Sequence, residues 1–293
     1  MESAIHPGWL PQWEGLVQRV MASPVTMVIG ESDTGKTTLV TALANALSAR
    51  HPSVAVVDAD LGQSEIGPPT TIGLGRVRAP LRRLGDAEVI GLHFVGTTSP
   101  AGNLLGALVG ARRMLDRARA LGFERVVIDT SGLVAGALGG TLKRAKIDVT
   151  DAALVIALER AGECGHIVAA CAGAERPHVL RLPASPAVRP RSADERRRHR
   201  QERLQAYFAA ARSLTLPLDR VAVRAPSGEA LGPHHAADGL ELVLVGLEDR
   251  ARTTLGLGII RGVDFDRAVL LVDTNVPEAE VSAVAIGRET YPA

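Results

Sequence analysis

One eight-residue segment has the residue types that hold phosphate groups. Gly30-Glu31-Ser32-Asp33-Thr34-Gly35-Lys36-Thr37 matches the pattern G-x-x-x-x-G-K-[ST] in full, and Thr38 follows it. The segment lies between an apolar run and a helical stretch, where backbone N–H groups and a helix N-terminus together bind anions. Lys36 is expected to reach the β- and γ-phosphates, and the Thr37 hydroxyl is expected to ligate Mg²⁺. The sequence therefore predicts a nucleoside triphosphate site over residues 30–38.

Two carboxylates follow the next apolar run. Asp58 and Asp60 come directly after Val54–Val57, and Gln63 follows shortly afterwards. Because α/β sheets bind ligands at the carboxyl ends of their strands, both carboxylates are expected beside the phosphate loop. An aspartate there can accept the proton of an attacking alcohol during phosphoryl transfer. The alternative for each is a solvated aspartate that caps the next helix.

The phosphate loop together with Asp58-Ala59-Asp60-Leu61-Gly62-Gln63 resembles the Clp/Grc family of P-loop polynucleotide 5′-hydroxyl kinases. The resemblance covers about residues 25 to 290. It implies an enzyme that transfers the γ-phosphate of ATP, with Mg²⁺, to the 5′-OH of RNA or DNA. It also implies that Asp60 is the general base, that Gln63 positions the substrate, and that Asp58 belongs to the Mg²⁺ environment.

Two later segments resemble the substrate side of the same family. Thr97, Thr98 and Ser99 match its clasp region, and Thr130 and Gly132 match its Thr-x-Gly motif at a strand end. The resemblance therefore implies that these five residues bind the polynucleotide.

This chain departs from the family directly after that motif. Leu133 stands where the eukaryotic members usually have a tryptophan that stacks on a substrate base. Such stacking contributes about 1–3 kcal/mol per base. Lys143 follows the motif and is expected either to hold substrate phosphates or to be a surface lysine on a connecting helix.

A dense run of basic residues lies further along the chain. Residues 189–203 hold seven arginines and three carboxylates. On a helix, Arg196, Arg200 and Arg203 share a face, and Arg197 lies about 100° away. A charge run is ordinarily a solvated face, but beside a phosphate site a mobile lid that neutralises the transferring phosphoryl group is favoured. The resemblance indicates Arg196, Arg197 and Arg200 as the catalytic arginines.

The elements that position these residues follow from periodicity. Short apolar runs separated by helical stretches indicate a doubly wound parallel sheet with helices on both faces, as in P-loop NTPases. The expected strands are Val25–Ile29, Val54–Val57, Leu92–Val95, Val126–Ile128, Leu154–Leu158 and His178–Leu182, and the expected helices are Lys36–Arg50, Leu104–Leu121 and Cys164–Cys171.

The pattern changes after the arginine run. We expect a kinase domain over residues 1–213, with the lid helix at about 192–212, and a small β-rich domain over residues 214–293. The expected strands of the second domain are Val221–Arg224, Leu240–Val245, Thr254–Ile260, Ala268–Val272 and Val281–Ile286.

Composition limits the remaining possibilities. The net charge is +1, and only three of the 33 basic residues are lysines, namely Lys36, Lys143 and Lys146. The two cysteines do not have zinc-site spacing, and no apolar run is long enough to cross a membrane. We therefore expect a cytoplasmic protein without a membrane partner. The alternatives to the kinase are a nucleotide-bound scaffold or switch ATPase in RNA processing, and a small-nucleoside kinase. The sequence leaves the oligomeric state open.

Overall fold

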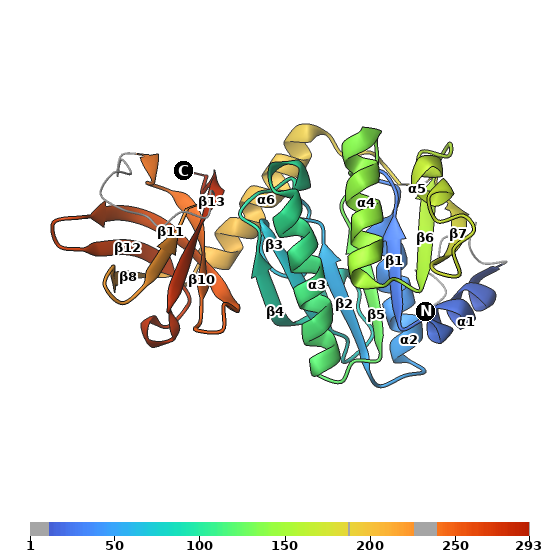
Figure 1. The fold of residues 1–293 in the computed structure, drawn as a ribbon, viewed down its shortest axis with the longest axis horizontal. Coiled ribbons are helices and arrows are strands. Elements are labelled where there is room, and N and C mark those ends of the chain that lie inside the picture. Colours follow the sequence, from blue (N-terminus) through green and yellow to red (C-terminus); the bar gives the residue numbers. More distant parts are fainter. Residues whose placement is uncertain (1–11, 187, 226–238, 293) are drawn as a thin grey trace.

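The computed structural model describes residues 12–186, 188–225 and 239–292, and all structural statements below concern these residues. They form two parts that lie side by side, with the C-terminal strands next to β4 (Glu88–Phe94) at the edge of the N-terminal sheet (Figure 1).

Five neighbouring strands of the N-terminal part run parallel, as the apolar runs predicted. In spatial order they are β7 (His178–Pro183), β6 (Leu154–Glu159), β1 (Val25–Ile29), β5 (Arg125–Thr130) and β2 (Val54–Ala59). The central three pair in close register, with Met27 opposite Ile128 and Val57 also opposite Ile128. The phosphate loop and the residues after β2 and β5 therefore share one edge of the sheet.

The prediction of a purely parallel sheet is wrong at one side. β3 (Thr71–Arg76) pairs antiparallel with β2, and β4 (Glu88–Phe94) pairs antiparallel with β3. β3 was not predicted from the sequence because Gly73 and Gly75 interrupt its apolar pattern and weaken strand propensity. Gly73 is required by packing, since a Cβ there would lie 1.9 Å from the Ile66 carbonyl oxygen. The sheet is therefore mixed.

Helices cover both faces of this sheet, as expected for a doubly wound fold. Successive strand residues face opposite sides, so Val28, Val56 and Val127 pack on one face, and Met27 and Ile128 on the other. The first face is covered by α1 (Trp13–Ala22) and α2 (Lys36–Ser48), and the second by α3 (Leu104–Ala120) and α4 (Gly136–Thr150), while the short α5 (Gly165–Ala169) follows β6. The bounds of α4 were not predicted, because Gly136, Gly139 and Gly140 lower its helix propensity.

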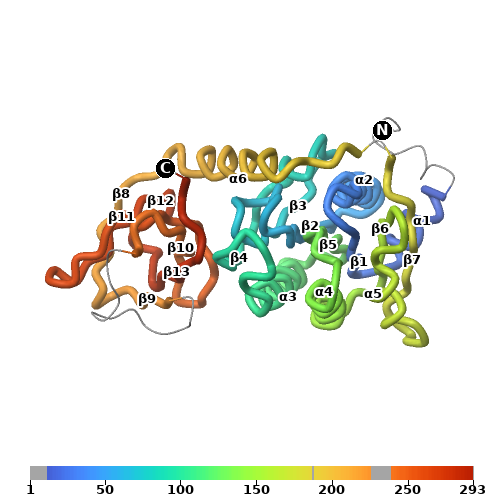
Figure 2. Tube along the Cα trace, turned by 90° about the horizontal axis from the view of Figure 1, so that it is seen from above, coloured from blue at the N-terminus to red at the C-terminus, as the bar shows by residue number. Residues whose placement is uncertain are grey.

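The arginine-rich segment forms one helix, α6 (Ala193–Phe208). Ser192 begins it with a capping box, in which Glu195 N–H donates to Ser192 Oγ at 3.1 Å and Ser192 N–H donates to Glu195 Oε2 at 2.6 Å. The helix ends four residues before the predicted end at Arg212, because Phe208 packs into the C-terminal core and Arg212 starts a strand. Figure 2 shows α6 running along one side of the molecule, from the N-terminal part to the C-terminal strands.

The C-terminal part is a set of mainly antiparallel strands. Its strand β11 (Thr254–Asp264) pairs with β4 through Thr254 and Leu92, which joins the two parts into one sheet. The predicted boundary between residues 213 and 214 falls inside β8 (Arg212–Pro217). The strands are β8 (Arg212–Pro217), β9 (Ala222–Arg224), β10 (Val243–Glu248), β11 (Thr254–Asp264), β12 (Val269–Thr274) and β13 (Ala283–Thr290). No helix within the described ranges is long and apolar enough to cross a membrane.

The close approach at Gly73 generates a stability prediction. We expect Gly73→Ala to lower the free energy of unfolding by about 1–3 kcal/mol, because the added methyl group forces the Ile66 backbone outward. The matched control is Gly15→Ala on the exposed face of α1, where a Cβ has nothing within 4 Å. It should be neutral or stabilising, since alanine favours helices. Urea unfolding of the two variants measures the difference, and equal stabilities would contradict the packing argument.

Candidate active site

The phosphate loop connects β1 to α2 with the backbone that its pattern requires. Gly35 is the residue before α2 and has φ 93°, and Asp33 has φ 56°. These left-handed residues turn the chain so that successive N–H groups line a concavity. Inside it, Lys36 Nζ donates to the Glu31 carbonyl oxygen at 2.6 Å, and Thr34 Oγ1 donates to the same oxygen at 2.9 Å.

Lys36 is held among carboxylates. Its side chain is buried, and burial lowers the pKa of Lys36, while the charges of Asp129, Asp60 and Asp33 act in the opposite direction. The ammonium group therefore lies where added negative charge, such as that of a phosphate, is favoured.

Thr37 contacts a carboxylate that the sequence analysis did not assign. Thr37 Oγ1 donates to Asp129 Oδ2 at 2.6 Å, and Asp129 Oδ1 accepts from Thr130 N–H at 2.8 Å. Burial raises the pKa of Asp129 to about 6, and the charge of Lys36 opposes this shift. A hydroxyl beside a carboxylate is a donor set that suits Mg²⁺, so the residues present fit that ion. In the sequence, Asp129 could have been identified by its position directly after the apolar run Val126–Ile128.

Asp58 is bound to its own loop and not to Thr37. Its Oδ1 accepts from Asp60 N–H at 3.1 Å, and its Oδ2 accepts from the N–H groups of Glu65 at 2.6 Å and Ile66 at 2.9 Å. Burial and the charge of Asp129 raise the pKa of Asp58, and these backbone donors act in the opposite direction. Asp58 therefore lies under the loop that carries Asp60, and its part in the Mg²⁺ environment stays a prediction.

Asp60 and Gln63 lie where the sequence predicted them, beside the phosphate loop. They line a cavity of about 210 Å³ together with Lys36, Thr37 and Arg196. Asp60 Oδ1 accepts from Gly62 N–H at 3.1 Å and from Gln63 N–H at 3.0 Å. Gln63 Nε2 donates at 3.4 Å to the carbonyl oxygen of Arg196, which joins the Asp60 loop to α6.

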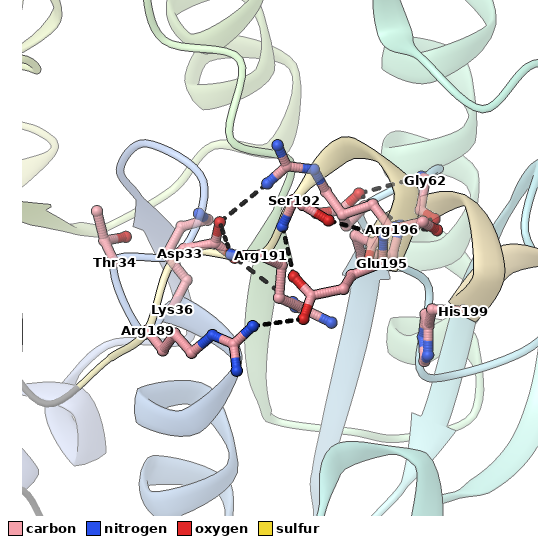
Figure 3. Close-up of polar contacts among 12 residues, drawn as sticks. Asp33, Thr34, Lys36, Gly62, Arg189, Arg191, Ser192, Glu195, Arg196 and His199 are labelled. Atoms are coloured by element: carbon pink, nitrogen blue, oxygen red, sulfur yellow. Dashed lines mark hydrogen bonds and ion pairs between the residues drawn. The ribbon is translucent and has the colours of Figure 1, made fainter.

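The phosphate loop also holds the start of α6 through Asp33. Arg196 Nη1 donates to Asp33 Oδ2 at 2.9 Å, and Arg191 N–H donates to the same oxygen at 3.0 Å (Figure 3). Arg160, which the sequence analysis did not assign, donates to the Asp33 carbonyl oxygen. Asp33 therefore connects the phosphate loop to the start of α6.

The three predicted lid arginines occupy different places. Arg196 lines the cavity, whereas Arg197 is two-thirds exposed and pairs with Asp194 at 3.7 Å. Arg200 is half-buried one turn further along α6. Arg203 donates to the carbonyl oxygens of Glu65 and Gly67 at 2.8 Å each, so it attaches α6 to the Asp60 loop.

The Thr-x-Gly segment lies against the phosphate loop, with Gly132 packed on Ser32. Thr130 is fully buried, and its hydroxyl donates to the Val28 carbonyl oxygen at 2.8 Å. Leu133, at the position of the family's stacking tryptophan, packs against the core between the sheet and α3 and α4. The structure therefore places Thr130 and Leu133 as packing residues.

Lys143 is the clearest correction to the expected placement. It is fully buried in α4, where its Nζ donates to Thr130 Oγ1 at 2.8 Å and to the Ser131 carbonyl oxygen at 2.5 Å. Lys146 is also fully buried, and its Nζ has no hydrogen-bond partner in the described part of the chain. Burial lowers the pKa of both lysines. All three lysines of the chain thus lie near Asp60 and Asp129, where a compact ammonium on a flexible stem takes less space than a planar guanidinium.

The chain is similar to one family of known proteins and to two curated relatives. The family described as mRNA cleavage and polyadenylation factor CLP1 P-loop matches residues 30–210. A polyribonucleotide 5′-hydroxyl-kinase of Pyrococcus furiosus is 32% identical, over 89% of this chain and 86% of the relative. A protein of the same name from Pyrococcus abyssi is 30% identical over the same shares.

The fold has a counterpart among solved structures. Wild-type Clp1p, in its complex with Pcf11p, matches with a TM-score of 0.73 over 97% of this chain and 79% of that chain. At 14% identity, this likeness concerns the fold alone.

The buried Lys146 generates a pH-dependent stability prediction. Burial lowers its pKa to about 8, from 10.5 in the unfolded chain. Between these pH values the unfolded chain binds more protons, so stability rises with pH, and below pH 8 the buried charge costs roughly 3 kcal/mol. We expect Lys146→Met to raise the free energy of unfolding at pH 7 by up to about that amount, and the gain to shrink toward pH 10.5.

Urea unfolding at pH 7, 9 and 10.5 measures this gain. The matched control is Arg144→Met, at an exposed position on the same helix, which should show no pH-dependent gain. A Lys146→Met protein that is less stable than the parent at pH 7 would contradict the prediction.

Proposed function

The chain belongs to the CLP1 P-loop family, and from this premise we propose that it is a polynucleotide 5′-hydroxyl kinase that acts on RNA with ATP as phosphate donor. The observation that carries the proposal is one cavity lined by the phosphate loop, by Asp60 and by Arg196. This lining combines the predicted phosphate loop, a carboxylate and a guanidinium, and phosphoryl transfer depends mainly on such positioning and electrostatics.

ATP is proposed to bind with its phosphates on residues 30–38. The backbone N–H groups of the loop and the N-terminus of α2 would hold phosphate oxygens. Lys36 Nζ would exchange the Glu31 carbonyl oxygen, 2.6 Å away, for the β- and γ-phosphates.

Thr37 and Asp129 are the residues we propose to hold Mg²⁺, because their oxygens lie 2.6 Å apart beside the loop. When bound, this ion supplies positive charge against the phosphate oxygens. Asp58 then acts through the Asp60 loop, since both its oxygens accept backbone N–H groups.

Asp60 is the proposed general base. Its carboxylate would take the proton of the terminal 5′-OH while that oxygen forms a bond to the γ-phosphorus. The bond from the γ-phosphorus to the bridging oxygen breaks, and ADP leaves. Two N–H groups already fix Asp60 Oδ1, so the orientation of the carboxylate is set before substrate binds.

Arg196 is the lid residue best placed to neutralise the γ-phosphoryl group. Asp33 holds it at 2.9 Å next to the loop, and a triphosphate offers a stronger acceptor at nearly the same place. We propose that Arg197, on the outer side of α6, and the half-buried Arg200 bind the polynucleotide backbone, which makes binding sensitive to salt. In the same scheme Gln63, Thr97, Thr98, Ser99 and Gly132 border the path of the acceptor end.

A transfer assay tests the proposed activity. The protein is incubated with γ-labelled ATP and Mg²⁺ and offered a 5′-OH RNA oligonucleotide, the matching DNA, their 5′-phosphorylated forms and free nucleosides. Label on the 5′-OH oligonucleotides alone is the expected result. Label on nucleosides alone would indicate a small-nucleoside kinase, and ATP hydrolysis without labelling would indicate a switch ATPase.

Asp60 generates the next prediction. We expect Asp60→Asn to lower kcat by about 10²–10⁴-fold, because the amide cannot take the proton. ATP affinity should change little, since the phosphates are held by the loop. Steady-state kinetics and ATP titration measure the two quantities, with exposed Asp116→Asn on α3 as control. Equal losses in kcat and in ATP affinity would count against a general base.

The lid provides a matched pair of variants. Arg196→Ala is expected to lower kcat by about 10²-fold or more, because a cation at the transferring phosphoryl group is removed. Arg197→Ala, one residue away but directed outward, should leave kcat within a few-fold and raise KM for the oligonucleotide. The pair is compared at low and high salt, and a larger kcat effect for Arg197→Ala would reverse the assignment.

A further inference from the structure

The C-terminal part contacts the expected substrate loop directly, through the last strand of the chain. Arg288 N–H, in β13, donates to the Gly96 carbonyl oxygen at 2.7 Å. Gly287 packs against Gly96, with a Cβ built on Gly287 only 3.2 Å from Gly96 Cα. The loop over residues 96–99, which follows β4, is therefore clamped by β13.

One carboxylate organises this contact. Glu289 Oε1 accepts from Thr98 N–H and from Thr98 Oγ1, each at 2.9 Å, and lies 3.4 Å from Thr97 Oγ1. The side chain of Glu289 is half-buried, and it lies 191 residues along the chain from Thr98. A single carboxylate oxygen of the C-terminal part thus accepts hydrogen bonds from two successive residues of the loop.

The same loop lies against the proposed catalytic carboxylate. A Cβ on Gly62 would approach the Thr98 carbonyl oxygen to 2.7 Å, so only glycine allows this packing. Gly62 N–H in turn donates to Asp60 Oδ1 at 3.1 Å. Glu289, Thr98, Gly62 and Asp60 therefore form one continuous series of contacts.

The hydrogen-bond direction at Thr98 has a chemical consequence. A threonine hydroxyl has one proton, and here that proton points to Glu289, so the oxygen is left as an acceptor. A fixed acceptor beside a carboxylate favours groups that donate hydrogen bonds, such as sugar hydroxyls. It disfavours a terminal phosphate, which has only acceptor oxygens and negative charge.

We propose that Glu289 is a positioning residue of the acceptor site, which orients Thr98 so that the site selects hydroxyl ends of a polynucleotide over phosphorylated ends. This inference rests on the proposed kinase function. It makes the C-terminal part a component of the acceptor site and not only a support for α6.

The test compares two substitutions of Glu289. Glu289→Ala removes the acceptor oxygen, and Glu289→Gln keeps an oxygen at the position of Oε1. For Glu289→Ala we expect about a 10-fold rise in KM and Kd for a 5′-OH RNA oligonucleotide, because hydrogen bonds to a charged group are lost. Its kcat and its KM for ATP should stay within about two-fold, and Glu289→Gln should restore KM to within about three-fold of the parent.

Discrimination between ends is measured at the same time. Kd is determined by fluorescence anisotropy for 3′-labelled oligonucleotides that carry either a 5′-OH or a 5′-phosphate, with a non-hydrolysable ATP analogue present. The preference for the 5′-OH end is expected to fall in Glu289→Ala. Glu280→Ala, on an exposed turn of the same part, is the control and should behave as the parent.

Three results would overturn the proposal. They are an unchanged KM and Kd in Glu289→Ala, a parallel loss of kcat, ATP binding and oligonucleotide binding, and a Glu289→Gln protein as impaired as Glu289→Ala. Because Kd is measured without turnover, the binding result tests the role of Glu289 independently of whether the protein is a kinase. A parent protein that binds 5′-OH ends and transfers no phosphate would refute the kinase function while the binding data still decide the role of Glu289.

Discussion

The burial of opposite charges at the carboxyl ends of β1, β5 and β2 is the constraint on which the surrounding structure depends. Removing an ammonium or a carboxylate from water costs several kcal/mol unless a partner or hydrogen bonds compensate. The compensation is visible around each aspartate. Backbone N–H groups surround Asp58, Thr37 and Thr130 hold Asp129, and the turn after β2 holds one oxygen of Asp60. The loops at this edge are therefore ordered by the charges that they solvate.

The three lysines are the basic residues at the same edge of the sheet. Lys36 and Lys143 donate to carbonyl or hydroxyl oxygens, whereas the buried Lys146 Nζ has none in the described ranges. All three lysines lie near Asp60 and Asp129 at this edge of the sheet. A chain that otherwise uses arginine for its basic residues keeps all three lysines here. Only lysine combines a compact charge with a flexible stem that reaches the loop from inside a helix.

Helix α6 converts this local order into a connection between the two parts of the molecule. The hydrogen bond from Arg196 to Asp33 connects its first turn to the phosphate loop. At the other end, Phe208 in its last turn packs in the C-terminal core. Helix α6 is therefore fixed to a different part of the molecule at each end. A second connection between the two parts is the contact of β13 with the loop after β4.

The sequence by itself determined the features whose parts are neighbours along the chain. The phosphate loop, the strand that leads to Asp60, the helices on both faces and most C-terminal strands follow from patterns within a few residues. The tertiary structure alone decided which carboxylate meets Thr37, which arginine faces the loop, that Lys143 is buried, and that β3 makes the sheet mixed. It also brought Glu289 to Thr98 across 191 residues. The physical reason is that local periodicity reports which face of an element is apolar, whereas a hydrogen bond between distant residues depends on how the elements pack, and no local pattern records that.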